Sequence, residues 1–425
     1  MTDARLRHGR ISLAISFFVQ GVVFALLVTR IPAVQDRYGI SDGLLPAFLA
    51  AVPMLAGAGS IGTERLVKRA RPGAVLRWAQ PVVCLALLGV GVGDGFEQVA
   101  VALAVFGLAV GALDASMNML GVSLQRAYGR SIMLGFHAAY SLGGIVGASL
   151  AWAGARWGLS LIVLYGPLMA VLAPAALLAS RWYTDRADRA GPADGADRVD
   201  QRKPRAQVVD VAAPPHPGMR FLLPLCLVMA FVYIGDSTVA NWSAKYLRDV
   251  LGGSEQLSTV PYNVYMAMTL LGRAVGDVGV RRFGPVAVVR AGAVIGAGGF
   301  GVVAVAPGAW VGIAGFTVLG LGLCVIVPQT FAAGGRLAFE RLGPEGSDAA
   351  VARLNIFNYV GFLVGSPLVG ALGEAWSHRG AMLVPLLLVL VTVPYARAFG
   401  PEPRPIPCRH ERPRTTDVGR GSNGL

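Results

Sequence analysis

The fold of this chain is decided by a segment that occurs twice, GSIGTERLVKRARPGAVLR at 59–77 and GRAVGDVGVRRFGPVAVVR at 272–290. A shift of 213 residues makes seven of the nineteen positions identical, and it aligns the acids Glu64 and Asp277. Similarity at one long, fixed interval indicates a duplicated structural unit. We therefore predict two homologous halves.

Two polar segments, 181–219 and 399–425, lie between the halves and at the end of the chain. Both are rich in Arg and Pro and lack apolar periodicity. Such a composition cannot bury enough apolar surface to order itself, so we predict a disordered cytoplasmic linker and a disordered cytoplasmic tail. The predicted domains are an N-terminal six-helix bundle, 1–180, and a C-terminal six-helix bundle, 220–398.

The composition indicates a membrane protein. Of the 425 residues 54% are hydrophobic and 14% are charged, whereas a soluble protein carries about 25% charged residues. A membrane span needs about 20 apolar residues. Twelve transmembrane helices are predicted on this basis, at 11–33, 44–62, 75–94, 98–122, 133–155, 158–180, 220–245, 259–280, 286–306, 309–334, 350–373 and 379–398. The expected fold is all-α, with the helices in two pseudo-symmetric bundles.

The basic residues set the expected orientation. They cluster in every second loop, for example at 65–71, 126–130 and 281–282. Cytoplasmic loops carry such an excess of Lys and Arg, so both termini are predicted in the cytoplasm and the chain in the inner membrane. The net charge of +13 is explained by the same clusters, and we predict no nucleic-acid partner.

Several other functional classes are disfavoured. The apolar run 11–31 is longer than the ~7–15 residues of a signal-peptide core, so no cleavable signal peptide is expected. The four cysteines have no metal-ligand spacing, and no phosphate-cradling loop is present. We therefore expect no cofactor, no metal and no use of ATP by the chain itself. A membrane enzyme is disfavoured because no nucleophile–base set is evident.

Two halves of six helices related by a parallel repeat are typical of one transporter architecture, and the chain resembles the major facilitator superfamily over nearly its whole length. The repeated segment resembles that superfamily's loop between helices 2 and 3, although Lys68 replaces the usual acid and Arg71 the usual glycine. Five strings are similar to a bacterial permease branch near the fucose permeases: TRIPA (29–33), DASMN (114–118), FHAAYSLG (136–143), GDSTVANW (235–242) and GFLVGSPLVG (361–370).

The resemblance implies a permease that moves a small molecule by alternating access, with helices 1, 4, 7 and 10 lining the cavity. Sugar-like solutes and exported toxic compounds both remain open, as does the direction of transport. The expected partners are this substrate, protons as the coupling ion and the lipid bilayer, and the expected state is a monomer. A transport-inactive sensor or scaffold is the alternative.

The charges of the repeated loops are candidates for a gate. In each half an acid precedes a base by four residues, and such a pair at a helix end can hold the cytoplasmic ends together. The alternative is a solvated loop that only sets topology. The candidate gating residues are Glu64, Lys68, Arg69, Asp277, Arg281 and Arg282.

Polar groups found in only one half are candidates for function. Asp114 and Asp236 align with Val327 and Val23 under the 213-residue shift, and His137 aligns with Asn358 once eight further residues between helices 10 and 11 are allowed for. An unpaired Asp at the membrane centre costs at least ~2.5–3.5 kcal/mol, so these residues are expected to face an internal cavity. We predict proton coupling at Asp114 with His137 as its partner, and at Asp236. The alternatives are a polar contact between helices 4 and 5 and an acid in the periplasmic vestibule.

Further polar and aromatic residues at membrane depth are candidates for substrate binding, with snorkelling or helix packing as the alternative. They are Gln20, Arg30, Asn118, Tyr140, Asn241, Trp242, Tyr265, Gln329 and Asn358. Two glycine runs, 143–147 and 361–370, predict close packing between helices.

Overall fold

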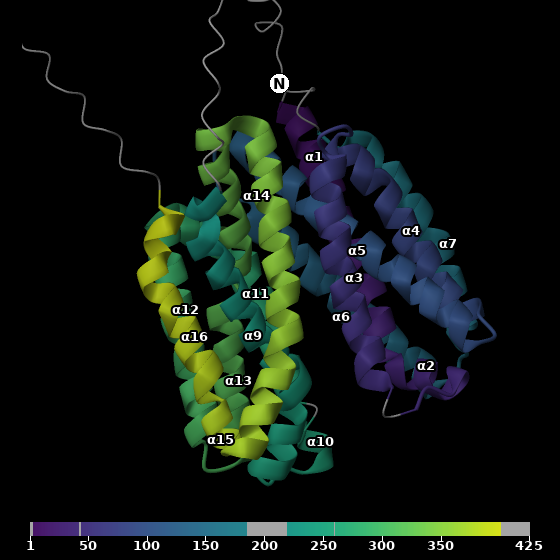
Figure 1. Cartoon of the computed structure of the whole chain (residues 1–425), viewed down its shortest axis with the longest axis vertical. Coiled ribbons are helices and arrows are strands. Elements are labelled where there is room, and N and C mark those ends of the chain that lie inside the picture. Colours follow the sequence, from purple (N-terminus) through teal and green to yellow (C-terminus); the bar gives the residue numbers. More distant parts are fainter. Residues whose placement is uncertain (1–2, 42–43, 185–218, 259, 401–425) are drawn as a thin grey trace, which may run out of the picture.

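The computed structural model describes residues 3–41, 44–184, 219–258 and 260–400 (Figure 1). Most of the predicted linker, 181–219, and of the predicted tail, 399–425, lies outside these residues. Within them the chain is helical.

The first half contains seven α-helices. They are α1 (Asp3–Thr29), α2 (Ile31–Tyr38), α3 (Leu45–Leu66), α4 (Pro72–Val92), α5 (Phe96–Tyr128), α6 (Met133–Arg156) and α7 (Leu161–Ala179), followed by the 3₁₀ turn η1 (Ser180–Trp182).

The second half begins with the 3₁₀ turn η3 (Met219–Leu222) and contains eight α-helices. They are α9 (Leu223–Lys245), which continues as the π-helical turn η4 (Tyr246–Val250), α10 (Glu255–Ser258), α11 (Val260–Phe283), α12 (Pro285–Val305), α13 (Ala309–Leu323), α14 (Ile326–Ala375), α15 (His378–Ala381) and α16 (Leu383–Tyr395), with a final 3₁₀ turn η5 (Ala396–Phe399).

The helices form twelve transmembrane spans. Within the described ranges nine helical runs are long and apolar enough to cross a membrane, and one of them, Ala309–Ala375, is two spans joined at a bend. The bend lies at Gly343, whose φ of 72° is the left-handed conformation that glycine adopts without strain. The two arms of α14 are therefore 326–342 and 344–375. Together with α3 and α11, of 22 and 24 residues, this makes the predicted twelve.

Local sequence signals recur at equivalent places in the two halves. Pro72 begins α4 and its repeat counterpart Pro285 begins α12, because proline is well suited to the first turn of a helix, where its missing N–H is not needed. Gly39 and its counterpart Gly252 both have left-handed backbones, with φ of 63° and 67°. The duplication predicted from the sequence is thus visible in helix starts and turns.

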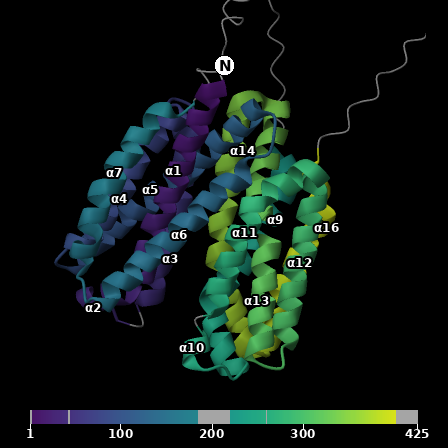
Figure 2. The same ribbon diagram turned by 180° about the vertical axis from the view of Figure 1, so that it is seen from behind.

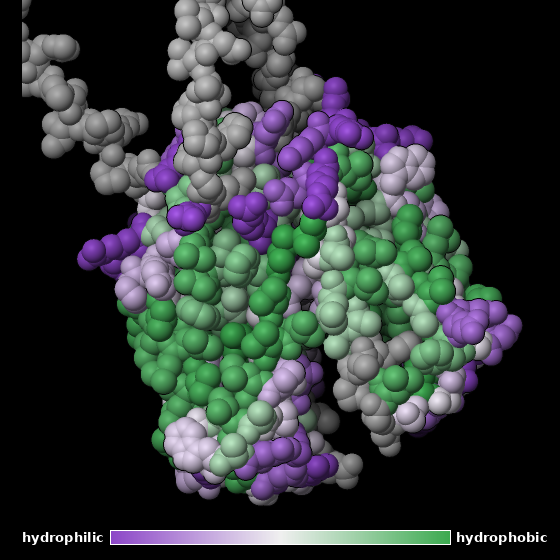
Figure 3. Space-filling view, in the orientation of Figure 1, coloured by the Kyte–Doolittle hydropathy of each residue, from purple (hydrophilic) through white to green (hydrophobic). Residues whose placement is uncertain are grey.

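The helices separate into two bundles, α1–α7 and α9–α16 (Figures 1 and 2). The first and last described residues, Asp3 and Gly400, lie at the same end of the molecule, which we call the terminal end; α2, α10 and α15 lie at the opposite, distal end. A hydrophobic belt covers the sides and a hydrophilic band covers the terminal end (Figure 3). Large apolar side chains such as Leu85 and Val305 are 61% and 76% exposed, as expected for a lipid-facing surface.

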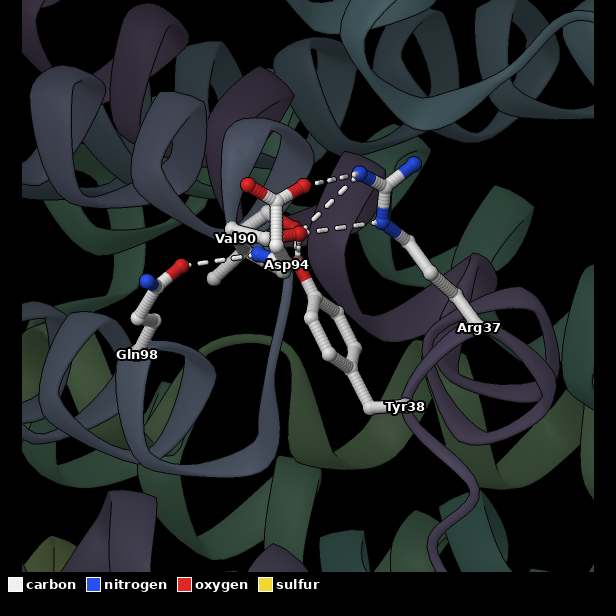
Figure 4. A network of polar contacts seen from close by, with 6 residues as sticks. Arg37, Tyr38, Val90, Asp94 and Gln98 are labelled. Atoms are coloured by element: carbon white, nitrogen blue, oxygen red, sulfur yellow. Dashed lines mark hydrogen bonds and ion pairs between the residues drawn. The ribbon is translucent and has the colours of Figure 1, made fainter.

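A polar cluster holds α2 across the distal end of the first bundle (Figure 4). The Tyr38 hydroxyl donates to the carbonyls of Val90 (2.6 Å) and Gly93 (2.9 Å), at the end of α4. Arg37 also donates to the Gly93 carbonyl and lies 4.0 Å from Asp94. These side chains satisfy carbonyls that the end of a helix leaves without a backbone donor.

The glycine run in α6 allows close contact with α1. A Cβ on Gly143 would collide with the carbonyl of Phe18, and one on Gly147 with the carbonyl of Val22. The equivalent run in α14 faces α9, where Gly361 lies against the carbonyl of Ala230. The predicted close packing is confirmed in both bundles.

We expect Gly143→Ala to lower the free energy of unfolding by about 1–3 kcal/mol, because two backbones must separate to admit the methyl group. Gly144→Ala is the matched control, since a Cβ there meets no atom within 4 Å. Unfolding in a denaturing-detergent titration measures both. Equal losses from the two variants would contradict the packing argument.

Candidate functional site

Asp114 of α5 connects the two bundles. One carboxylate oxygen accepts a hydrogen bond from the amide of Gln20 on α1, and the other accepts one from the hydroxyl of Tyr359 on the second arm of α14. Gln20 is 5% exposed. The carboxylate thus has one partner in its own bundle and one in the opposite bundle.

The other two residues predicted near this carboxylate do not touch it. Asn118 donates from its amide to the backbone carbonyl of Asp114 (2.9 Å), and its own side-chain oxygen is buried without a partner. His137 lies between Phe17 and Phe331, with ring centroids 5.3 and 6.2 Å away, and its Nε2 has no partner. The two described side chains share no hydrogen bond in this conformation, so the predicted pairing of Asp114 with His137 is not observed here.

Asp236 of α9 accepts a hydrogen bond from the hydroxyl of Tyr265 on α11. Both residues belong to the second bundle, and Tyr265 is 3% exposed. Tyr265, a substrate candidate in the sequence, is thus the donor that holds this second acid.

Three further residues predicted to bind the substrate instead donate hydrogen bonds to backbone carbonyls of the chain. Arg30 donates to the carbonyl of Leu159 (3.1 Å), Trp242 to the carbonyl of Ser366 (3.0 Å), and Asn241 to the carbonyl of Ser237 (2.9 Å). The bonds of Arg30 and Trp242 join different segments of one bundle, whereas the bond of Asn241 stays within α9.

Tyr140 of α6 and Tyr233 of α9 are different. Each is part-buried, and neither hydroxyl has a hydrogen-bond partner among the described residues. These two groups are available to a solute.

The acid Asp277, near the end of α11, reaches across to the first bundle. It accepts hydrogen bonds from the Ser131 hydroxyl (2.6 Å) and from the backbone N–H of Gly135 (2.9 Å), and it is 7% exposed. Arg281, one turn on, donates to the Ser131 carbonyl (3.1 Å), and Gln329 donates to the Ser131 hydroxyl (3.5 Å).

Its repeat counterpart Glu64 also contacts the opposite bundle. It does so on the other side of the interface between the two bundles, which we call the seam. Glu64 of α3 lies 3.7 Å from Arg353 of α14. Deeper in the seam Asn355 donates to the Ser60 hydroxyl (2.7 Å), and the amide of Asn358 donates to Asn355 (3.3 Å).

The expected pairing of each acid with the base four residues later is thus wrong. The acids meet partners in the opposite bundle because the helix ends point at the seam rather than along the surface. Lys68 and Arg69 are exposed, and Arg282 lies over the Phe283 ring, 5.5 Å from its centroid.

Hydrogen bonds and an ion pair that join described residues of the two bundles lie between the Asp114–Tyr359 contact and the terminal end. In the distal half the bundles separate and the surface is hollowed between them (Figure 3). The molecule is closed at the terminal end and open at the distal end.

No family model matches the sequence. The chain is 28% identical over 404 residues to an uncharacterized MFS-type transporter of Yersinia pestis, covering 92% of this chain and 95% of that protein. It is 25% identical to the membrane protein MosC of Rhizobium meliloti, over 91% of this chain and 89% of MosC. Its structure matches FucP, the Escherichia coli fucose:proton symporter, in the outward conformation, with a TM-score of 0.72 and 16% identity over 92% of this chain and 98% of FucP.

The fold is that of the major facilitator superfamily. The human organic anion transporter MFSD10 matches equally well, with a TM-score of 0.72 and 14% identity over 93% of this chain and 100% of that one. The chain is therefore a multi-pass membrane protein whose relatives are MFS-type transporters.

Within the major facilitator fold one further charged residue, which is not among the predicted site residues, joins the two bundles. Arg273 of α11 donates to the Ser141 hydroxyl in the first bundle (2.7 Å). It also donates to the Cys324 carbonyl (3.4 Å), at the break in regular helical bonding between α13 and α14. The available signal was an arginine inside a predicted span, 259–280. Tyr359 carried only the weak signal of an aromatic residue at membrane depth, and Ser131 carried none, since a lone serine is common at helix ends.

Proposed function

We propose that this protein is a secondary active transporter that moves a small molecule by alternating access, with protons as the coupling ion. The terminal end is the cytoplasmic end, and the described conformation is open to the outside. The observation that carries the proposal is the Asp114 carboxylate, which is tied to Tyr359 of the opposite bundle at the boundary between the closed seam and the distal opening.

This position couples protonation to movement. To open the terminal end, the second arm of α14 must leave α5, so the bond from Tyr359 to Asp114 must break. Hydrogen bonds to a charged acceptor are worth about 1.5–3 kcal/mol and neutral ones about 0.5–1.5 kcal/mol. A proton that reaches Asp114 from the distal opening therefore weakens the bond and favours the inward-open state.

The substrate binds in the hollow between the bundles. The free hydroxyls of Tyr140 and Tyr233 come from different bundles, so a solute that contacts both bridges the seam. Asp236, held by Tyr265, supplies a second acid in the same region for the proton or for the solute. A bound solute that draws the bundles together at the distal end favours release at the other side.

The test is a pair of distance measurements on the reconstituted full chain with its native cysteines replaced. Spin labels at Glu97 and Glu374 report the distal end, and labels at Arg71 and Glu340 report the terminal end. On acidification we expect the distal distance to shorten and the terminal distance to lengthen together. If both distances stay fixed across pH and a broad solute library, the proposal fails and a transport-inactive scaffold is favoured.

The substrate can be sought with the same protein. A compound that binds the native state raises its thermal stability. We expect the substrate to stabilise wild type more than Asp236→Asn, with Asp94→Asn, an acid 91% exposed in a distal loop, as the control.

A further inference from the structure

A basic pocket opens on the side of the molecule at the terminal end. Its volume is about 340 Å³, and it lies between the first turns of α1 and the connection from α5 to α6. Figure 2 shows α1 and α6 side by side below the N-terminus. The pocket is lined by Arg7, Arg10, Ile11, Ala14, Tyr128 and Arg130.

Two of the three arginines of this pocket lie over one aromatic ring. The guanidinium carbons of Arg10 and Arg130 lie 5.9 and 5.6 Å from the centre of the Tyr128 ring, within cation–π range. Among the described residues no carboxylate forms an ion pair with Arg7, Arg10 or Arg130. Three like charges held together repel one another. An anion that binds in the pocket is attracted by all three guanidiniums and offsets this repulsion.

The lower wall of the pocket is apolar and faces outwards. Ile11 is 54% exposed, and Ile15, one turn further into the membrane on the same face of α1, is 37% exposed. A ligand with a charged head and a hydrocarbon tail matches this order of charge above and apolar surface below. A small free anion has no hydrocarbon chain and would make no favourable apolar contact with Ile11 and Ile15.

We propose that the pocket binds the phosphate of an anionic phospholipid. Basic pockets between transmembrane helices at the cytoplasmic surface suit such head groups. The phosphate lies among the guanidiniums of Arg7, Arg10 and Arg130, and one acyl chain lies along Ile11 and Ile15. Arginine suits this role because its planar fork can present two donors to phosphate oxygens.

The bound lipid acts next to the closed seam. Arg130 directly precedes Ser131, which donates to Asp277. A terminal nitrogen of Arg10 and a carboxylate oxygen of Asp277 lie 3.7 and 3.5 Å from the point that a Cβ on Gly135 would occupy. Fixing Arg10 and Arg130 with a phosphate therefore holds in place the first-bundle side of the Asp277 contact, which Ser131 and Gly135 form.

The experiment is a titration of the full chain in neutral detergent with dioleoylphosphatidylglycerol, followed by native mass spectrometry. Each basic residue near a membrane surface contributes about a fivefold increase in affinity for anionic lipid. Replacing Arg7, Arg10 and Arg130 together with Gln is therefore expected to weaken binding about a hundredfold. Replacing the three with Lys keeps the charge, and we expect a much smaller loss.

The matched control removes the same charge from the same end of the molecule. It replaces Arg65, Arg71 and Arg181, which are exposed and lie outside the pocket, with Gln. If the control loses as much affinity as the pocket variant, or the pocket variant binds as wild type does, the proposal is overturned. If inorganic phosphate displaces the lipid at concentrations similar to those at which the lipid itself binds, the pocket is a site for free anions. That result would also overturn the proposal.

Discussion

Asp114→Asn is expected to leave the protein folded and to remove most of the pH dependence of its conformation. Asparagine keeps the shape of the side chain and can still form a neutral hydrogen bond with Tyr359 or Gln20. Since it carries no charge at any pH, the difference between a charge-assisted and a neutral bond, about 1–2 kcal/mol, disappears. The variant should therefore resemble acidified wild type, with the ratio of terminally open to terminally closed molecules raised about 5- to 30-fold.

The spin-label pairs on the distal and terminal ends measure this ratio, and two further variants separate the causes. Tyr359→Phe removes the donor from the opposite bundle and keeps the charge, so it should favour the open terminal end at every pH. Asp94→Asn, on the distal surface, should behave as wild type. An Asp114→Asn protein that retains the full pH response would remove Asp114 from the coupling mechanism.

The fold could be predicted from the sequence because both of its determinants are local or repetitive. Apolar runs show where spans lie, and the 213-residue repeat shows that six spans were duplicated. Helix ends were less predictable, since apolar composition reports the thickness of the bilayer and not the length of the helix. The structure accordingly extends α1 back to Asp3, and it continues α14 through the predicted loop 335–349 with a bend at Gly343.

The candidate site could be predicted only residue by residue. Asp114 and Asp236 could be identified because the other half has no acid at the equivalent positions. Gln20 could be identified because it is a polar residue at membrane depth. Which side chains become hydrogen-bond partners depends on the rotational orientation of each helix and on how the two bundles pack together. No local sequence pattern indicates either. Tyr359, 245 positions after Asp114, became its partner, whereas His137 turned towards two phenylalanines.

The repeated acids illustrate the same limit. Asp277 and Glu64 occupy equivalent positions, yet the opposite bundle offers them different partners. Asp277 is buried and accepts two hydrogen bonds, from the Ser131 hydroxyl (2.6 Å) and from the Gly135 N–H (2.9 Å). Glu64 has an ion pair at 3.7 Å with an arginine whose side chain is 39% exposed. Partly exposed ion pairs are worth only about 0–1 kcal/mol, because water screens them.

Asp277→Asn is therefore expected to destabilise the closed terminal end far more than Glu64→Gln. An asparagine at position 277 can accept from only one of its two donors, and it turns an NH₂ group towards the other. We expect a loss of about 2–4 kcal/mol of closed-state stability, a 30- to 1000-fold change in the open-to-closed ratio. Glu64→Gln should change that ratio less than about fivefold.

Spin labels at Arg71 and Glu340 report both variants in the same bilayer, so each serves as the control for the other. Ser131→Ala, which removes one of the two donors, should fall between them. Equal effects of Asp277→Asn and Glu64→Gln would contradict this argument. They would mean that the repeated position of the acid, and not its local contacts, decides how much it stabilises the closed terminal end. A larger effect at Glu64 would mean that the ion pair with Arg353 is the principal contact holding the terminal end closed.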